Sequence, residues 1–391
     1  SCASRADPAM GWLEYLLAAT AIRIVGALAS MRPIDEHRVL LASPRGRELN
    51  GALAVARDAI RDRRPSVDIR TLAEPYGYGI VAKLGYLLRV LRGAWQVRRS
   101  AVVIVDNAYL PVHVLAPRRG QRIAQVWHAS GALKRFGHAA HPAPHGPEAR
   151  FLHRGYTDAF VGGEAARAPY AAAFRMSASN VHAIGSLRAA PLADAAHVAV
   201  RRAELLSRYS QIGGRRLLLY APTFRGRGES RSGTGTIDLA AFRAALPREW
   251  AIGVKGHPGV ATDVGAALDA GSIDLIFDRA DEVESLFPVA DALLTDYSAS
   301  IFEWSLLLRP LVLFVPDLSE YRTSPGIFPD FDRELIGDFV RSERDAAAAV
   351  VAGRVDPVAW RAFAERNLGT PQQVADAPRR LVEILLPDRS S

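Results

Sequence analysis

The segment Ala292-Leu-Leu-Thr295-Asp296-Tyr-Ser298-Ala-Ser300-Ile-Phe-Glu-Trp304 joins a short apolar run to the start of a helix. The pattern predicts a buried strand that ends at Thr295 and a helix that Asp296 or Ser298 caps. Free backbone amides at a helix N-terminus bind anions, and hydroxyls such as that of Ser300 add donors without charge. Taken alone, the segment would by default indicate an ordinary capped helix.

The same alternation of short apolar runs and helical stretches continues on both sides, from Arg38 onward. This rhythm is typical of parallel sheets covered by helices. Ligands of such sheets bind beyond the carboxyl ends of the strands, so the loops after the strands are the candidate sites. The expected strands are Val39–Ala42, Val102–Asp106, Ile123–Trp127, Ala159–Val161, Leu217–Ala221, Ala251–Lys255, Leu293–Thr295 and Leu311–Val315.

A length of 391 residues suffices for two domains, each with its own core. We expect a boundary between Gly185 and Gln211, around a charged helix at Arg201–Tyr209. No internal repeat is evident, and the one low-complexity segment is Gly226–Gly235. The expected parts are an N-terminal helix at 10–31, an N-terminal Rossmann-like domain at 32–195 and a C-terminal one at 196–391.

Composition narrows the class of protein. The chain is 49% hydrophobic and 23% charged, as in folded proteins. Cys2 is the only cysteine, so neither an intramolecular disulfide nor a cysteine-based zinc site can form, which favours the cytoplasm. The net charge of +8 predicts attraction to polyanions, and charge alone does not distinguish nucleic acid, an anionic membrane and a phosphate-rich substrate.

Two N-terminal segments could contact a membrane. Trp12–Met31 is mostly apolar but contains Glu14 and Arg23, so we expect it to pack or to lie on a membrane surface without crossing. Met10, just before it, is a candidate natural start. Gly79–Arg99 predicts a basic amphipathic helix that either covers the N-terminal sheet or contacts membrane or acidic polymer. Its expected apolar face comprises Leu84, Leu87, Leu88, Leu91 and Trp95.

A histidine follows the expected strand at Ile123–Trp127, in Gln125-Val-Trp-His128-Ala-Ser-Gly-Ala-Leu-Lys134-Arg135. With an ordinary pKa near 6.5, such a histidine can take a proton from an attacking hydroxyl at neutral pH. A structural, hydrogen-bonded histidine is the alternative for this residue taken alone.

Two further strands end in cations. Tyr220-Ala-Pro-Thr223-Phe-Arg225-Gly-Arg227 supplies a hydroxyl and two guanidiniums, which suit phosphate oxygens. Gly253-Val-Lys255-Gly-His257-Pro258 ends in a lysine and a histidine that the following proline restrains. Surface arginines and a plain turn are the alternatives. The chain has no phosphate-binding P-loop, no His-Glu-x-x-His and no Gly-x-Ser-x-Gly, which disfavours the corresponding hydrolases.

In this order the segments resemble the CDP-glycerol glycerophosphotransferase family, which includes teichoic acid primases and polymerases and ribitol phosphate transferases. The resemblance runs from about Tyr78 to Phe331. Its motifs are Val105-Asp-Asn107, Trp127-His128, Tyr220-Ala-Pro-Thr223-Phe-Arg225, His257-Pro258, Thr295-Asp-Tyr-Ser298, Phe302-Glu303, Arg309-Pro310, Pro316-Asp317 and Glu320-Tyr321.

The resemblance implies a GT-B-like pair of Rossmann-type domains that face a cleft, and metal-independent transfer of a polyol phosphate with release of CMP. It implies His128 as the base on the acceptor hydroxyl and His257 as the group that stabilises the donor phosphate or leaving CMP. The implied donor- and phosphate-binding residues are Thr223, Arg225, Lys255, Thr295, Asp296, Ser298, Ser300 and Glu303, and those on the acceptor side are Lys134 and Arg135.

The implied partners are a CDP-polyol, an anionic polymer or lipid-linked acceptor, and the cytoplasmic face of the membrane, with no cofactor. Nucleic acid is not expected, because the basic segment carries Trp95 alone and offers no stacking platform. A GT-B nucleotide-sugar glycosyltransferase and a non-catalytic membrane-associated nucleotide- or polymer-binding protein are the alternatives.

Two segments depart from the family pattern. Gly185-Ser-Leu-Arg188-Ala-Ala lacks the usual proline, hydroxyl and acid, and Ser324–Asp330 replaces an aromatic-rich run. Both affect the choice of acceptor and polyol. The Ala-Ser-Gly-Ala after His128 is more similar to the ribitol-type members. Glycerol, ribitol or another polyol, and priming or polymerising, remain open at this stage.

Overall fold

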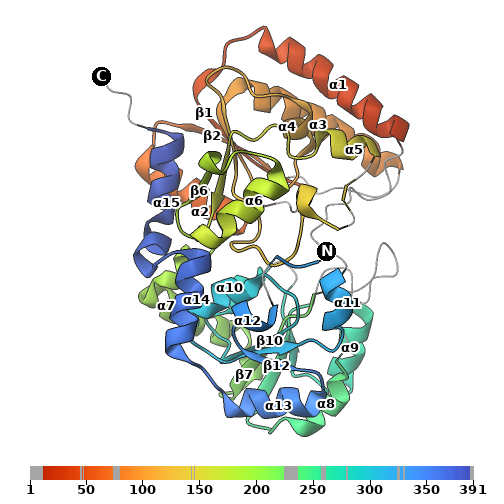
Figure 1. The fold of residues 1–391 in the computed structure, drawn as a ribbon, viewed down its shortest axis with the longest axis vertical. Coiled ribbons are helices and arrows are strands. Elements are labelled where there is room, and N and C mark those ends of the chain that lie inside the picture. The colour runs from red at the N-terminus through yellow and green to blue at the C-terminus, as the bar shows by residue number, and fades with distance from the viewer. Residues whose placement is uncertain are drawn as a thin grey trace. The chain divides into compact units, whose positions relative to one another are not determined.

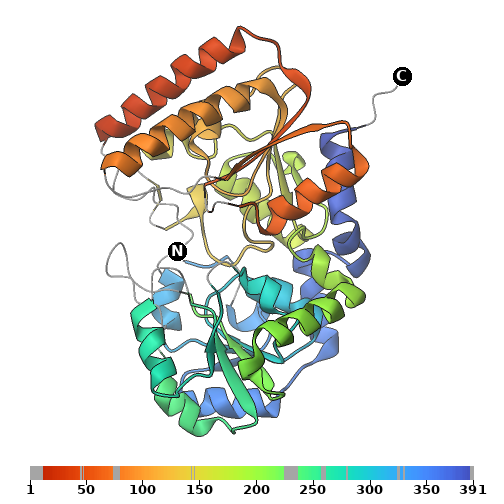
Figure 2. The same cartoon turned by 180° about the vertical axis from the view of Figure 1, so that it is seen from behind.

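The computed structural model describes residues 12–44, 46, 48–73, 80–141, 143–144, 146–223, 237–256, 261–278, 281–323, 326–328 and 331–387. The chain divides into two compact units, Ser1–Ala190 with Asn367–Ser391, and Pro191–Arg366. Each unit contains one six-stranded sheet with helices on its faces (Figures 1 and 2).

In the first unit all the strands are parallel, in the order β2-β1-β3-β4-β5-β6. The strands are β1 Asp35–Ser43, β2 Asp68–Ala73, β3 Ser100–Val105, β4 Arg122–Gln125, β5 Asp158–Val161 and β6 Val181–Ala183. The helices are α1 Trp12–Ser30, α2 Gly51–Arg63, α3 Ile80–Arg99, α4 Leu110–Val114, α5 Gly146–Phe151, α6 Arg167–Phe174 and α15 Pro371–Leu385.

Helices cover both faces of the first sheet, and successive strand residues, which point to opposite sides, are therefore buried on both faces. Val39 and Leu41 of β1 pack with α2 and α15, through residues such as Leu53 and Leu381. Leu40 packs on the other face with α1, α3 and α4. Burial of each such side chain contributes roughly 1.5–3 kcal/mol.

The second sheet is also parallel, in the order β12-β11-β10-β7-β8-β9. The strands are β7 Arg216–Tyr220, β8 Trp250–Val254, β9 Leu275–Ile276, β10 Ala292–Thr295, β11 Leu311–Phe314 and β12 Asp338–Val340. The helices are α7 Ala195–Arg208, α8 Leu239–Ala245, α9 Ala261–Asp269, α10 Ser300–Trp304, α11 Leu318–Thr323, α12 Phe331–Glu334, α13 Glu343–Ala352 and α14 Pro357–Leu368, which runs across the division.

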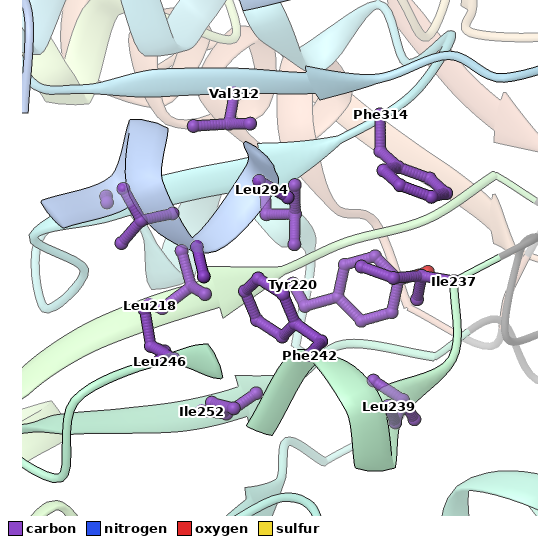
Figure 3. Close-up of a cluster of buried hydrophobic side chains, with 14 of the residues drawn as sticks. Leu218, Tyr220, Ile237, Leu239, Phe242, Leu246, Ile252, Leu294, Val312 and Phe314 are labelled. Carbon is purple, nitrogen blue, oxygen red and sulfur yellow. The ribbon is translucent and has the colours of Figure 1, made fainter. Parts of the chain in front are cut away.

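One hydrophobic core cluster of the second unit lies on a single face of this sheet. Leu218, Ile252, Leu294 and Val312, one from each of four strands, pack with Phe242 of α8 (Figure 3). All five side chains are fully buried. All eight expected strands are confirmed, seven of them to within two residues at each end, while β1 begins four residues earlier than expected. Strands β2, β6, β9 and β12 were not expected.

The C-terminal segment does not belong with the second unit, although the expected division placed 196–391 in one domain. Ser186 N–H donates to the Leu368 carbonyl oxygen at 3.0 Å, and α15 packs on the first sheet. A Cβ on Gly185 (φ 102°) would lie 2.2 Å from the Gln373 carbonyl oxygen, so only glycine permits this approach. The break near Ala190 lies inside the expected boundary region.

The buried face of α3 also differs from the expected one. Val90, Ala94 and Val97 face the sheet, whereas Leu88 is 62% exposed. Small residues allow closer packing here, since a Cβ on Gly93 would lie 2.0 Å from the Tyr109 hydroxyl oxygen. Helix α3 therefore covers the sheet, and α1 packs along it (Figure 1). Gly226–Gly235 lies outside the described residues.

Candidate functional site

The strand order of the second sheet predicts where its ligand binds. From β7 the chain proceeds outward to β8 and β9, and then returns to β10 on the other side of β7. Ligands of doubly wound sheets bind at this reversal, beyond the carboxyl ends of the two central strands. The loops after β7 and β10 carry Thr223 and Asp296, which places two of the expected donor-binding residues at the reversal.

Asp296 ties these two loops together. Its Oδ1 accepts hydrogen bonds from the backbone N–H of Thr223 at 2.9 Å and from that of Tyr297 at 2.7 Å. The side chain is 5% exposed. A carboxylate held in this way orders the backbone around a phosphate site, and its charge makes it a poor direct ligand for a diphosphate.

Thr295 occupies a different position from the one expected of a donor ligand. The residue is fully buried, and its hydroxyl donates to the Ala221 carbonyl oxygen at 2.6 Å. Its side chain therefore holds the end of β10 to the end of β7. The sequence pattern could not distinguish this inward-facing hydroxyl from the outward-facing ones, because alternation becomes irregular where a strand ends.

The serines lie where the chain enters α10. Ser298 Oγ lies 2.7 Å from Ser300 Oγ and accepts a hydrogen bond from the Ser300 N–H at 3.3 Å. Ala299 directly before α10 has no side-chain cap, but Ser298 accepts from a backbone N–H of the first turn and so serves as the cap, one of the two expected alternatives. Asp296 accepts from Thr223 and Tyr297 and does not cap the helix. Ser298 is half-buried and Ser300 is buried. The pair forms a small hydroxyl cluster beside the Asp296 loop.

Lys255 and Glu303 are buried at the same end of the sheet. Lys255 is 8% exposed, and its Nζ donates to the Asp278 carbonyl oxygen at 2.8 Å. This contact joins the loop after β8 to the loop after β9. Glu303, in α10, is 1% exposed. Arg225 and His257, the expected cations of this site, lie outside the described residues.

A tyrosine pair supports the β10 loop and was not among the expected site residues. The ring of Tyr297 stacks on that of Tyr321, with 3.6 Å between centroids and 12° between planes. The Tyr297 hydroxyl donates to Asp317 Oδ1 at 3.0 Å. The motifs Pro316-Asp317 and Glu320-Tyr321 were the available signal, and they pointed to the family without indicating this packing role.

The first sheet has its own reversal, between β1 and β3, since β2 lies outside β1 and the later strands follow β3. Ser43 at the end of β1 donates from Oγ to Oδ2 of Asp106, just after β3, at 3.1 Å. This bond joins the two strand ends at the place where an open sheet of this order binds its ligand.

His128 lies beside this bond. Its Nδ1 is 3.4 Å from the backbone carbonyl oxygen of Asp106. A carbonyl oxygen only accepts, so Nδ1 carries the proton and the basic lone pair is on Nε2. The His128 ring lies against that of Trp127, with 4.4 Å between centroids, and the side chain is half-buried. An oriented and partly accessible imidazole is suited to general-base chemistry.

Lys134 and Arg135 follow in the same loop as His128, and both are half-buried. The first unit therefore brings His128 to the carboxyl edge of its sheet, and the second brings Thr223, Asp296, Ser298 and Ser300 to the edge of its own. Among the described residues, no group of three or more histidine, cysteine, aspartate or glutamate side chains could hold a metal ion.

Comparisons with known proteins agree with the fold and with these motifs. Residues 24–364 match the family model described as CDP-glycerol:poly(glycerophosphate) glycerophosphotransferase. The teichoic acid ribitol-phosphate primase of Bacillus spizizenii is 29% identical over 319 residues, which are 79% of this chain and 81% of that protein. The teichoic acid poly(ribitol-phosphate) polymerase of the same organism is 27% identical over 76% of this chain, which spans about half (48%) of the polymerase.

The solved structure of the wall teichoic acid polymerase TagF, soaked with CDPG, superposes with a TM-score of 0.73. The likeness covers 96% of each chain at 16% identity. Together with the two parallel sheets, it confirms the expected GT-B-like class with two Rossmann-type units.

Proposed function

The chain belongs to the CDP-glycerol:poly(glycerophosphate) glycerophosphotransferase family, and we propose that His128 is the base of its reaction and that the β7–β10 loops bind the donor. It is a transferase that moves a polyol phosphate from a CDP-polyol donor and releases CMP. The observation that carries the assignment of His128 is its position. The ring lies at the reversal of the first sheet, with Nδ1 directed to the Asp106 carbonyl.

The proposed step is a displacement at phosphorus. The acceptor hydroxyl attacks the phosphorus that bears the polyol and transfers its proton to Nε2 of His128. The new P–O bond forms while the bond to the bridging oxygen breaks, and CMP leaves with that oxygen. Positioning and charge stabilisation supply most of the catalysis in such transfers.

The donor diphosphate is proposed to bind the second unit at the Thr223, Ser298 and Ser300 hydroxyls. Two observations support this site. The strand order of the second sheet reverses between β7 and β10, and the Asp296 carboxylate accepts a hydrogen bond from the Thr223 backbone amide and so holds that amide in place. Arg225 and His257 come shortly after β7 and β8 in the sequence, and they are proposed to neutralise the charge of the diphosphate. This use of side-chain cations is why we expect transfer without a divalent metal.

CDP-ribitol is the first donor to test, and CDP-glycerol the second. One observation supports this order: the two curated relatives named above are ribitol-phosphate enzymes. The acceptor is proposed to be a teichoic-acid-type polymer or its lipid-linked precursor. Lys134 and Arg135 lie in the loop after His128, where they would attract such an anionic chain.

The enzyme is proposed to bind the cytoplasmic face of the membrane through α1. Leu13, Leu17, Ile24 and Leu28 form one stripe of this helix and are between 53% and 69% exposed. Helix α1 is long and apolar enough to cross a membrane, the one such helix among the described residues. Its other face packs on the first unit with Ile22 fully buried, and crossing would forfeit that packing. The net charge of +8 favours an anionic lipid surface.

The assignment is tested by measuring CMP release from CDP-ribitol and CDP-glycerol with a lipid-linked acceptor, with and without EDTA. We expect CMP from one of the two, unchanged by chelation. Activity that EDTA abolishes and a divalent ion restores would contradict metal-independent transfer. Release of UDP from UDP-sugars in place of CMP would contradict the donor class.

A further inference from the structure

Trp127, the residue before His128, has an unusual backbone conformation. Its φ is 49°, in the left-handed region, which is sterically unfavourable for a bulky L-residue. The side chain is 2% exposed and stacks on Phe136 at 5.1 Å between centroids. This conformation sets the direction in which the chain presents His128, so whatever holds it also aims the imidazole.

The side chain of Gln125 holds this turn. It is fully buried, its Oε1 accepts from the Trp127 N–H at 2.8 Å, and its Nε2 donates to the Asn107 carbonyl oxygen at 3.2 Å. A backbone N–H only donates and a carbonyl only accepts, so the amide orientation is fixed at both ends. Gln125 thus links the loop after β3 to the left-handed turn after β4.

Tyr156 holds Gln125 in turn. The Gln125 Nε2 also donates to the Tyr156 hydroxyl oxygen at 2.8 Å. That oxygen lies 3.1 Å from His113 Nε2 and 3.3 Å from His153 Nδ1. We call these four side chains, Gln125, Tyr156, His113 and His153, the Tyr156 network.

The protons of the Tyr156 network can be assigned from its contacts. His153 is 3% exposed, and its Nε2 has no hydrogen-bond partner among the described residues. A bare ring nitrogen is cheaper to bury unpaired than an N–H group, so Nδ1 of His153 carries the proton and donates to Tyr156. The Tyr156 oxygen then accepts twice and donates its own proton to His113 Nε2. Every bond in the network has one donor and one acceptor, with both histidines neutral.

We propose that Gln125 and Tyr156 are positioning residues that hold Trp127 in its left-handed conformation and thereby fix the direction of the His128 ring. The proposal rests on the proposed role of His128. Neither residue touches the reacting atoms. Their hydrogen bonds disfavour a second conformation of this turn, in which Trp127 has an ordinary negative φ and the His128 ring points away from the Asp106 carbonyl.

Gln125→Met and Tyr156→Phe test the proposal, because each keeps the packing volume and removes only hydrogen bonds. The matched control is Gln121→Met. Gln121 is another buried glutamine, 4% exposed, and it directly precedes β4, at the end of that strand opposite to Gln125. Its Nε2 donates to the carbonyl oxygens of Val97 and Ser100. Its loss has a comparable structural cost without reaching the His128 turn.

Two quantities are measured on the full chain. The first is CMP release from the active CDP-polyol, where we expect kcat to fall roughly 10- to 100-fold in Gln125→Met, and less in Tyr156→Phe, with the donor KM within about threefold. The second is the tautomer of His128, read from long-range ¹H–¹⁵N spectra of ¹⁵N-histidine protein and assigned with His128→Ala. Nδ1–H should dominate in the wild type and in Gln121→Met, and should lose that dominance in Gln125→Met.

Unchanged kcat and unchanged His128 signals in both variants would overturn the proposal, as would an equal loss of kcat in Gln121→Met. If Gln125→Met does not fold, Tyr156→Phe decides the question by the same two readouts. If the wild type releases no CMP from any CDP-polyol, the proposed function fails, while the His128 spectra still test the positioning claim.

Discussion

The Asp296 carboxylate accepts a hydrogen bond from the backbone N–H of Thr223 at 2.9 Å, which joins the loop after β7 to the loop after β10. These loops leave the two strands between which the second sheet reverses its order. The bond therefore sets the spacing of the site that we assign to the donor diphosphate, although Asp296 itself is not suited to bind an anion.

Asp296→Ala and Asp296→Asn distinguish the role of Asp296 as a hydrogen-bond acceptor that joins the two loops from a role of its negative charge. Asparagine retains an oxygen that can accept from both Thr223 and Tyr297, whereas alanine leaves two amides without that acceptor. We expect the donor KM to rise at least tenfold in Asp296→Ala and to stay within about threefold in Asp296→Asn. Steady-state kinetics of CMP release measure both, and equal loss in the two variants would mean that the negative charge is required.

Gly185→Ala should destabilise the first unit by releasing the C-terminal segment. The added Cβ would lie 2.2 Å from the Gln373 carbonyl oxygen at a φ of 102°. We expect a loss of roughly 3 kcal/mol in the free energy of unfolding. Gly120→Ala is the control: its φ is 77° with nothing within 4 Å, so only the backbone strain of about 1 kcal/mol applies. Equal urea midpoints for the two variants would show that the contact with α15 is unimportant.

Stability should fall as the pH drops from about 6.5 toward 3. Burial lowers the pKa of His113 to about 3, and burial together with His113 and His138 lowers that of His153 well below 6.5. The unfolded chain therefore binds protons in this range that the folded chain does not, and each histidine costs up to about 2 kcal/mol by pH 5.

Urea midpoints at pH 7 and pH 5 measure this dependence. His113→Gln should reduce the difference between the two midpoints, whereas His197→Gln, at an exposed position of α7, should leave it unchanged. Asp158 does not interfere, because His182 and Arg122 hold its pKa below the ordinary 3.8, so its contribution is lost only under stronger acid. A midpoint independent of pH between 7 and 5 would contradict the buried, neutral histidines.

Membrane binding should depend on the exposed stripe of α1. The double variant Leu17→Asp/Ile24→Asp adds two negative charges to that stripe, and we expect vesicles with anionic lipid to bind it at least tenfold more weakly. The control Val200→Asp/Val358→Asp makes the same change at residues that are 61% and 76% exposed elsewhere. Cosedimentation with vesicles measures the binding of both double variants. Equal weakening in the two would show that net charge alone, and not the α1 stripe, determines the binding.

The sequence predicted the central strands and the loops that follow them, because buried parallel strands read as continuous apolar runs. It missed β2, whose residues are mostly half-buried or exposed. It also misplaced α15, since no local pattern records that a C-terminal helix returns to the first sheet. Thr295 was expected at the site because a hydroxyl at a strand end gives no sign of which way it faces.

The role of Gln125 was equally inaccessible from the sequence. No local sequence pattern around Trp127 predicts its left-handed φ. Two hydrogen-bond partners of Gln125, Asn107 and Tyr156, are distant from it along the chain. His128 could be named as a candidate from the sequence, because a histidine directly after a buried strand is a local feature, and its catalytic role stays a prediction.

The most direct test of the account compares CMP release by the wild type and by His128→Ala, with the active CDP-polyol and a lipid-linked acceptor. If His128 takes the proton of the acceptor hydroxyl, CMP release should fall by roughly 10²–10⁴-fold, while equilibrium binding of the donor stays within about threefold. Turnover close to that of the wild type in His128→Ala would contradict the account and remove His128 from the mechanism.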